Sequence, residues 1–158
     1  MMNWDYLAGF VDGEGSLSLN RGAAKRTGDR PRALCFRPCL GITNNNRQVL
    51  ELIQCFLRDG AIYRCERSSV NARVGWRFVI MGNRLLPVLR ELEPRLHIKQ
   101  RQAELLIAFI ERRKQLRTRR LTETDYEFVR QCRALNNRAP GHGAPHVPLP
   151  ARLQATLW

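Results

Sequence analysis

Apolar residues recur at two different spacings along this 158-residue chain, and the spacings predict its helices and strands. Residues 4–12 are mostly apolar and follow Asn3, which predicts a first helix capped by Asn3 and ended by glycines from Gly13 onward. Residues 16–20 and 34–43 alternate between polar and apolar side chains. This period of two predicts two strands joined by a basic loop.

Helical spacing returns at residues 49–57, after three asparagines that can cap a helix and before Gly60, which is expected to close it. Residues 61–67 and 73–81 have strand character and predict a second hairpin. Further helices are expected at residues 83–92, 98–113 and 122–135.

The order of these elements indicates the fold class. It runs helix, two strands, helix, two strands, then helices, without strict alternation of strand and helix. We therefore predict an α+β fold with an antiparallel sheet. Near residue 139 the composition shifts toward Pro, Gly, Ala and His. We assign one domain to residues 1–138 and a tail without regular structure to residues 139–158.

The net charge of the chain indicates which class of partner it binds. Lys and Arg number 27 against 14 Asp and Glu, a formal charge of +13. Such a surplus favours a polyanionic partner, with a solubility charge as the alternative. The five cysteines follow no secretory leader, and no apolar run reaches the roughly 20 residues of a membrane span. We expect an intracellular protein of a bacterial cytoplasm or an organelle, neither secreted nor bound to a membrane.

The stretch DYLAGFVDGEGSLSL, residues 5–19, has two glycines inside its predicted helix. Gly9 and Gly13 are four residues apart and so lie on one helix face, where with Ala8 they form a flat strip. A glycine in a helix costs about 1 kcal/mol relative to alanine. Close approach of a second backbone would offset this cost, and a copy of the same helix related by a two-fold axis would fit.

Two acids, Asp12 and Glu14, lie at the C-terminal end of this helix. The helix dipole disfavours carboxylates there, so their presence suggests a bound cation. Two such helices side by side would bring carboxylates together to hold a divalent metal against phosphates. For Asp12 a role as a turn or capping residue is an equal alternative.

The nine residues LAGFVDGEG, from Leu7 to Gly15, resemble the signature of the LAGLIDADG homing endonucleases. ITNNN at residues 42–46 and LHIKQRQAELL at residues 96–106 are similar to later segments of single-motif members. The resemblance covers residues 4–113. It implies the αββαββα fold with a four-stranded antiparallel saddle sheet, to which this chain adds C-terminal helices.

The resemblance also implies an activity. A single motif implies a homodimer that cuts both strands of a long pseudo-palindromic DNA site across the minor groove, in the service of intron mobility. The reaction would be phosphodiester hydrolysis that depends on Mg²⁺ or another divalent cation such as Mn²⁺, with no small-molecule substrate. By the same resemblance, Glu14 and the Gly13 carbonyl hold the metal, and Asn44 and Lys99 assist catalysis. The dimer interface would comprise Ala8, Gly9, Asp12 and Gly13.

The polar faces of the predicted strands would meet double-stranded DNA. Arg can contact guanine through two hydrogen bonds, and Asn can do the same with adenine. The alternation of the strands and, for Arg67, the resemblance assign these residues to DNA binding: Ser18, Asn20, Arg37, Cys39, Arg67, Arg73 and Arg77. A zinc site is not expected, because Cys35 and Cys39 are too far apart on one strand to share an ion.

Two alternatives remain open at this stage. The first is a cleavage-inactive DNA-binding regulator or intron-splicing maturase on the same fold; Glu14 argues against it. The second is a basic RNA-binding module, which would need neither a metal nor the glycine strip.

Overall fold

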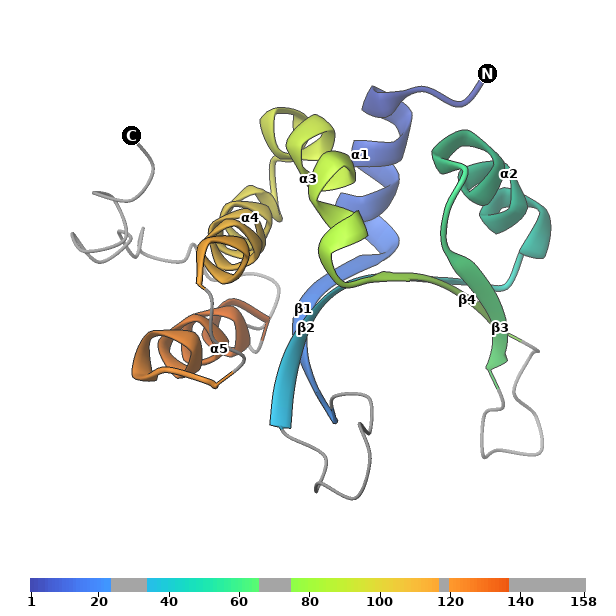
Figure 1. The fold of residues 1–158 in the computed structure, drawn as a ribbon. Coiled ribbons are helices and arrows are strands. Elements are labelled where there is room, and N and C mark those ends of the chain that lie inside the picture. The colour runs from blue at the N-terminus through green and yellow to red at the C-terminus, as the bar shows by residue number, and fades with distance from the viewer. Residues whose placement is uncertain (24–33, 66–74, 117–119, 137–158) are drawn as a thin grey trace.

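The computed structural model describes residues 1–23, 34–65, 75–116 and 120–136 of the chain. The predicted tail at 139–158 lies outside these residues. The elements follow in the order α1 (Trp4–Glu14), β1 (Gly15–Ala23), β2 (Leu34–Asn44), α2 (Arg47–Leu57), β3 (Ala61–Cys65), β4 (Gly75–Met81), α3 (Leu86–Leu92), α4 (Gln100–Gln115) and α5 (Glu123–Asn136) (Figure 1). Short 3-10 turns, Asn83–Leu85 and Glu93–Arg95, flank α3. None of the described helices has the length and apolar character that crossing a membrane requires.

Helix α1 begins at the predicted residue, Trp4, and ends at Glu14, two residues later than predicted. The side chain of Asn3 caps its first turn through a hydrogen bond of 2.8 Å. The predicted end at Asp12 was wrong, because the helix continues to Glu14. Its last turn is closed by the backbone N–H of Gly15, which donates to the carbonyl of Val11. Asp12 and Glu14 therefore both lie in the final turn.

The four strands form one antiparallel sheet in the order β1-β2-β4-β3. Leu17 of β1 lies opposite Leu40 of β2, which lies opposite Ile80 of β4. All three side chains are fully buried, so they form one row of the core. Because side chains alternate along a strand, the neighbouring positions face the other side of the sheet.

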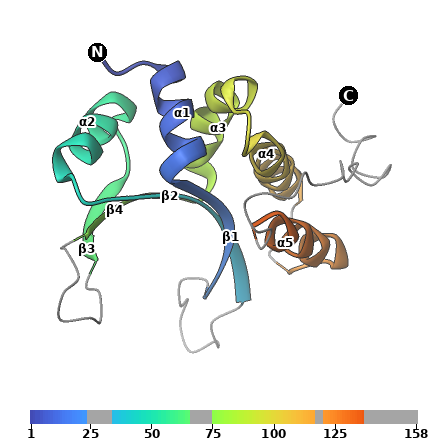
Figure 2. The ribbon, with the colours of Figure 1, turned by 180° about the vertical axis from the view of Figure 1, so that it is seen from behind.

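The helices cover one face of the sheet and leave the other open. The sheet is arched, with α1, α2 and α3 over its convex side and α4 and α5 along the β1 edge (Figures 1 and 2). The core between these layers includes the large side chains Leu7, Leu50, Ile53, Phe78, Leu89 and Leu92, all fully buried. The concave face is available for a partner.

Two predicted helix boundaries need correction. Helix α2 does not run to Gly60: it ends in the left-handed residue Arg58, with φ of 52°. Gly60, with φ of 95°, serves the next turn, where a Cβ would lie 2.3 Å from the Phe78 ring. Helix α4 starts at Gln100 rather than at residue 98. The apolar residues that recur at helical spacing in α4 are buried: Leu105, Leu106, Phe109 and Ile110.

Helix α5 covers the open edge of β1. The side-chain amide of Asn136 donates to the backbone carbonyl of Leu17 at 2.9 Å, and Phe128 packs edge-on against Phe109 of α4. A covered edge is protected from pairing with another strand. The interaction therefore links the helix to the sheet as well as to α4.

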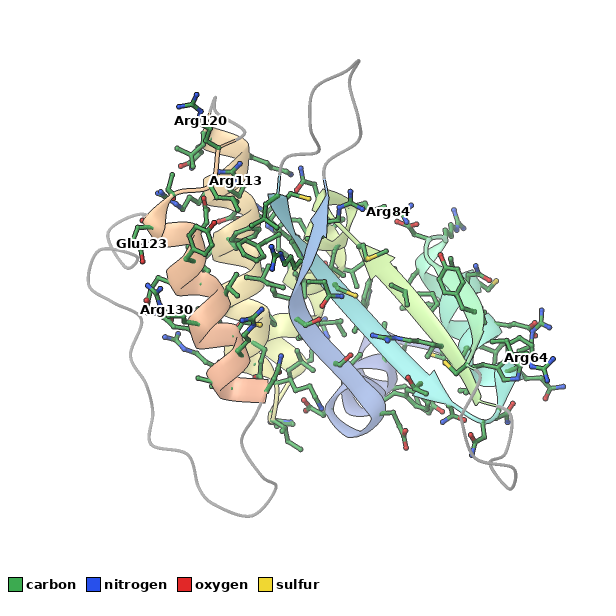
Figure 3. All side chains as sticks on the ribbon, turned by 90° about the horizontal axis from the view of Figure 1, so that it is seen from below. Arg64, Arg84, Arg113, Arg120, Glu123 and Arg130 are labelled. Carbon is green, nitrogen blue, oxygen red and sulfur yellow. The ribbon has the colours of Figure 1, made fainter. Side chains whose placement is uncertain are left out.

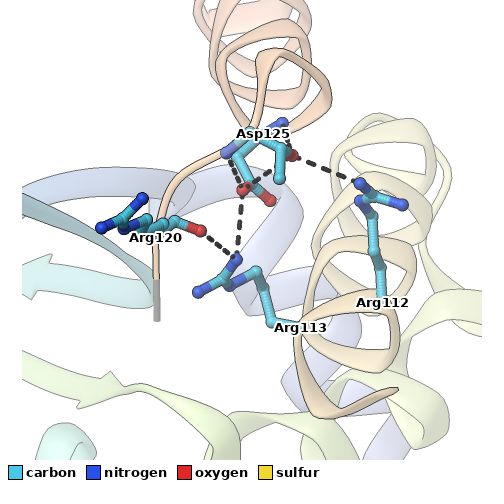
Figure 4. Close-up of polar contacts among 5 residues, drawn as sticks. Arg112, Arg113, Arg120 and Asp125 are labelled. Carbon is cyan, nitrogen blue, oxygen red and sulfur yellow. Dashed lines mark hydrogen bonds and ion pairs between the residues drawn. The ribbon is translucent and has the colours of Figure 1, made fainter. Parts of the chain in front are cut away.

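A buried carboxylate fixes α5 to α4 (Figure 4). Asp125 is 0% exposed, and its Oδ2 accepts hydrogen bonds from the backbone N–H of Thr122 at 2.7 Å and from Arg113 at 3.2 Å. The same arginine donates to the carbonyl of Arg120 at 3.1 Å, and Arg112 donates to the Thr122 hydroxyl. Thr122 and Asp125 thus cap the start of α5, and these arginines extend the contact to α4.

We expect Asp125→Ala to lower the free energy of unfolding by about 3 kcal/mol, since it leaves Arg113 without its buried partner. The matched control is Glu123→Ala, whose side chain is 81% exposed beside Arg130 and should change stability by less than about 1 kcal/mol. Urea denaturation of both variants measures the difference. Equal effects would show that the buried pair contributes no more than a surface pair.

Candidate functional site

The carboxylate of Glu14 stands free at the C-terminal end of α1. The side chain is exposed, and no hydrogen bond or ion pair joins it to another described residue. The carbonyl of Gly13 is among the terminal carbonyls that have no partner within the helix. Hard oxygens of this kind are the donors that Mg²⁺ prefers, so these two residues fit a magnesium ion.

Asp12, by contrast, is fully engaged within its own chain. Its carboxylate accepts hydrogen bonds from the backbone N–H groups of His97 at 2.8 Å, Ile98 at 3.2 Å and Lys99 at 3.0 Å. It therefore ties the turn that leads into α4, which begins at Gln100, to the end of α1. The assignment of Asp12 to the dimer interface stays a prediction, and the capping alternative raised for Asp12 agrees with this contact.

Lys99 is held beside the end of α1 by the same contact. Its ammonium group donates to the backbone carbonyl of Asp12. Partial burial lowers the pKa of Lys99, and the Asp12 carboxylate counters part of that shift. The structure thus places a cation at the helix end that also carries Glu14.

We expect Asp12→Asn to lower the free energy of unfolding by about 1 to 3 kcal/mol, because it replaces a charged acceptor of three backbone N–H groups with an amide that has one acceptor oxygen. Asp5→Asn is the control on the same helix; Asp5 is 84% exposed and pairs only with Arg95. Chemical denaturation compares the two variants. A loss no greater than that of Asp5→Asn would contradict the capping role.

Asn44 lies at the end of β2, on the same side of the sheet as Glu14's helix. Gly15 pairs with Ile42, so Asn44 is two residues beyond that pair, next to the end of α1. Its side-chain oxygen already accepts the backbone N–H of Asn46 at 2.8 Å. Its NH₂ group, and the second lone pair of its oxygen, are left to contact water or phosphate. Nearby, the Arg47 guanidinium stacks over the Trp76 ring at 4.6 Å.

The exposed face of α1 contains the two glycines of the predicted strip. A Cβ added at Gly9 or at Gly13 would meet nothing within 4 Å. Ala8 is only 1% exposed and belongs to the core, so its assignment to the dimer interface needs correction. Tyr6, 52% exposed and stacked on Phe10, lies on this helix and was not predicted.

No helix lies in front of the concave face of the sheet when the molecule is seen from below (Figure 3). On β1, Ser18 and Asn20 alternate with the buried Leu17 and Leu19, and so face this side. Ser18 donates to the side-chain oxygen of Asn20 at 3.0 Å. The face thus carries polar groups that can form hydrogen bonds with a partner.

The fold of this chain is similar to several solved structures. No protein-family model matches the sequence, and no curated protein matches it. The homing endonuclease I-CvuI in complex with its target aligns with a TM-score of 0.67 and 21% identity, over 98% of this chain and 91% of that chain. The archaeal intron-encoded homing endonuclease I-Vdi141I, complexed with DNA, aligns with a TM-score of 0.67 and 19% identity, over 88% and 86%. The LAGLIDADG homing endonuclease I-SmaMI, bound to cleaved DNA, aligns with a TM-score of 0.64 and 18% identity, over 99% of this chain and 48% of that chain.

The chain has the fold of the LAGLIDADG homing endonucleases. The predicted order αββαββα and the four-stranded antiparallel sheet are confirmed. The LAGLIDADG helix is α1, and the segment LAGFVDGEG occupies its last two turns and the first residue of β1.

The predicted DNA-binding residues fall into three groups: those on the concave face of the LAGLIDADG sheet, one that is buried, and those outside the described residues. Ser18, Asn20 and Arg37 lie together on the concave face, where Asn20 pairs with Arg37, and Arg77 joins them from β4. Cys39 shares this face but is only 1% exposed, so it offers no surface to DNA and that assignment needs correction. Arg67 and Arg73 lie outside the described residues.

Sequence reasoning missed two exposed apolar side chains on the same face. Tyr63 of β3 is 54% exposed and lies opposite Arg77, and Met81 of β4 is 38% exposed opposite Cys39. The alternation of Ile62, Tyr63 and Arg64 could have indicated that Tyr63 points away from the core. In the described part of the chain, no group of three or more His, Cys, Asp or Glu residues gathers where it could hold a metal.

Proposed function

We propose that this protein is a site-specific DNA endonuclease that acts as a homodimer and cuts both strands of a long pseudo-palindromic site by divalent-metal-dependent hydrolysis. The observation that carries the proposal is the exposed carboxylate of Glu14, which pairs with no described residue, at the end of a helix whose outer face is open at Gly9 and Gly13.

A second copy of the chain supplies what one subunit lacks. Mg²⁺ takes about six oxygen ligands, and one subunit offers a carboxylate and a carbonyl. A two-fold axis along the open face of α1 would bring two Glu14 side chains together between the subunits. Tyr6 would extend the contact at the other end of the helix. The remaining ligands would be DNA phosphates and water.

Each residue near the helix end has a separate part in the proposed reaction. Glu14 and the Gly13 carbonyl hold the metal, Mg²⁺ or Mn²⁺, which when bound polarises a phosphodiester oxygen and lowers the pKa of water. Lys99 offers its ammonium to the charge that develops on the phosphate. Asn44, whose oxygen accepts one hydrogen bond from Asn46, orients water or phosphate, with its NH₂ group as a hydrogen-bond donor.

The concave face would lie in the major groove. Arg37, Arg77 and Asn20 supply the donor and acceptor patterns that distinguish base pairs there. The excess of basic residues would supply phosphate contacts, so we expect binding to weaken steeply with rising salt. The side chains of the concave face would determine which DNA sequence is bound, and the positive charge of the chain would supply most of the affinity.

The test is cleavage of a plasmid library that carries randomised target sequences. The full chain should linearise a subset of plasmids only when Mg²⁺ or Mn²⁺ is present, and sequencing of the cut ends should reveal one pseudo-palindrome. Selective binding without cutting would instead support a DNA-binding regulator or an intron-splicing maturase. Binding to RNA alone, independent of metal, would contradict the proposal.

A further inference from the structure

Gly41 of β2 lies beneath the side chain of Arg77. A Cβ at Gly41 would stand 2.9 Å from Nη2 of Arg77, 3.1 Å from its Nε and 3.1 Å from the hydroxyl oxygen of Ser16. The end of the Arg77 side chain therefore lies close against the sheet, over a residue that has no side chain. Any residue other than glycine at position 41 would force this guanidinium to move.

The strand register shows how far the side chain of Arg77 reaches from its own strand. Arg77 pairs with Thr43, whereas Gly41 pairs with Val79 on one side and with Ser16 on the other. The side chain thus reaches diagonally from β4 across β2, a distance that long side chains can span. Its charge comes to lie over the middle of the four-stranded sheet rather than over β4.

A second observation agrees with this position. Burial raises the pKa of the Cys39 thiol, and the charge of Arg77 counters part of that rise, together with hydrogen bonding to Ser18 and Asn20. Cys39 and Gly41 are alternate residues on the same face of β2. The guanidinium is therefore close to both, which places it above β2.

We infer that Gly41 is a positioning residue that determines which base pair Arg77 contacts. The inference rests on the proposed function, since it requires this face to lie in the major groove. With position 41 empty, the guanidinium of Arg77 lies above β2, where its N–H groups can donate to the acceptors that guanine presents in the major groove. Two residues along a strand span about 7 Å, which corresponds to about two base pairs of DNA. Moving the guanidinium off Gly41 would thus shift or remove a guanine preference.

The experiment selects bound sequences from a duplex library randomised across the half-site, with Mg²⁺ left out so that binding is read without cutting. The full-length wild type is compared with Gly41→Ala, Arg77→Ala and Arg77→Lys. We expect Arg77→Ala to reduce the preference for guanine at one base pair per half-site by roughly ten- to hundredfold. Gly41→Ala should change the preference at the same base pair and leave the others as in the wild type. Arg77→Lys keeps the charge and should restore overall affinity but not the base preference.

Gly22→Ala is the matched control. It adds the same methyl group to the same face of the sheet, but the nearest atom, Nε of Arg37, would be 3.4 Å away, in ordinary contact. Its base profile should equal that of the wild type. Thermal unfolding checks that Gly41→Ala folds, which is expected because the atoms it meets include the flexible end of Arg77.

The outcomes separate the inference from the function it rests on. A wild type that selects no sequence would refute the proposed function. A wild type that selects a sequence, with a Gly41→Ala profile identical to it, would refute the positioning role of Gly41. A uniform loss of affinity in Arg77→Ala, without a change at any one base pair, would show that Arg77 contacts phosphate and would also overturn the inference.

Discussion

The Glu14→Gln variant is expected to bind its DNA target and to cut it at least on the order of 10³-fold more slowly than the wild type. The carboxylate is the only charged metal ligand that each subunit contributes in the proposed site, and a bound metal supplies several kcal/mol of transition-state stabilisation. Glutamine keeps the size of the side chain but removes its charge. Single-turnover cleavage with saturating enzyme measures the chemical step apart from binding.

The control for this variant is Glu123→Gln, the same substitution on α5 at a carboxylate whose side chain is 81% exposed. Figure 3 shows Glu123 among the helices beside the sheet, away from the concave face. This control should cut at the wild-type rate. If Glu14→Gln also cut at that rate, Glu14 would not be a metal ligand and the proposed centre would be wrong.

A large side chain at Gly9 is expected to separate the subunits while leaving each one folded. In Gly9→Leu the new side chain starts in open space, since a Cβ there would have no described neighbour within 4 Å. Leucine also favours the helix by up to about 1 kcal/mol over glycine. At a two-fold interface the extra bulk appears twice, so we expect the dimer to weaken by roughly 10²-fold or more. The rate of double-strand cutting should therefore decrease as the fraction of dimer decreases.

Sedimentation of the variant over a range of concentrations measures its mass, and circular dichroism checks its helix content. Ala134→Leu is the control, since it enlarges an exposed small residue on α5, away from the proposed interface. That variant should remain dimeric and active. A dimeric Gly9→Leu with full activity would exclude α1 as the interface, whatever the outcome for Glu14.

Much of the fold could be predicted because it follows from local spacing. The alternation around Leu17 and Leu40 placed both on the buried face of the sheet, and the period of α4 placed Leu105 and Phe109 in the core. The caps at Asn3 and Asn46 are also local, since each side chain bonds an amide two or three residues away. Such signals depend only on neighbours in the sequence.

The candidate site was predicted less completely. The sequence indicated Glu14 and, through the resemblance, Lys99, but it assigned Ala8 to an interface although this residue is buried in its own chain, and it did not reveal the contact that Asp12 makes. Asp12 bonds amides more than 80 residues away in the chain, which no local pattern reveals. Cys39 was placed on the correct face, yet neighbouring strands bury it.

The sequence by itself therefore determined the order of the elements, the inward faces and the glycine-lined first helix, because periodicity and capping act over a few residues. Only the tertiary structure decided that Asp12 holds the start of α4 and that Arg77 lies across Gly41. Those contacts depend on strand register and on packing between distant segments, where one side chain fills the space that another residue leaves empty.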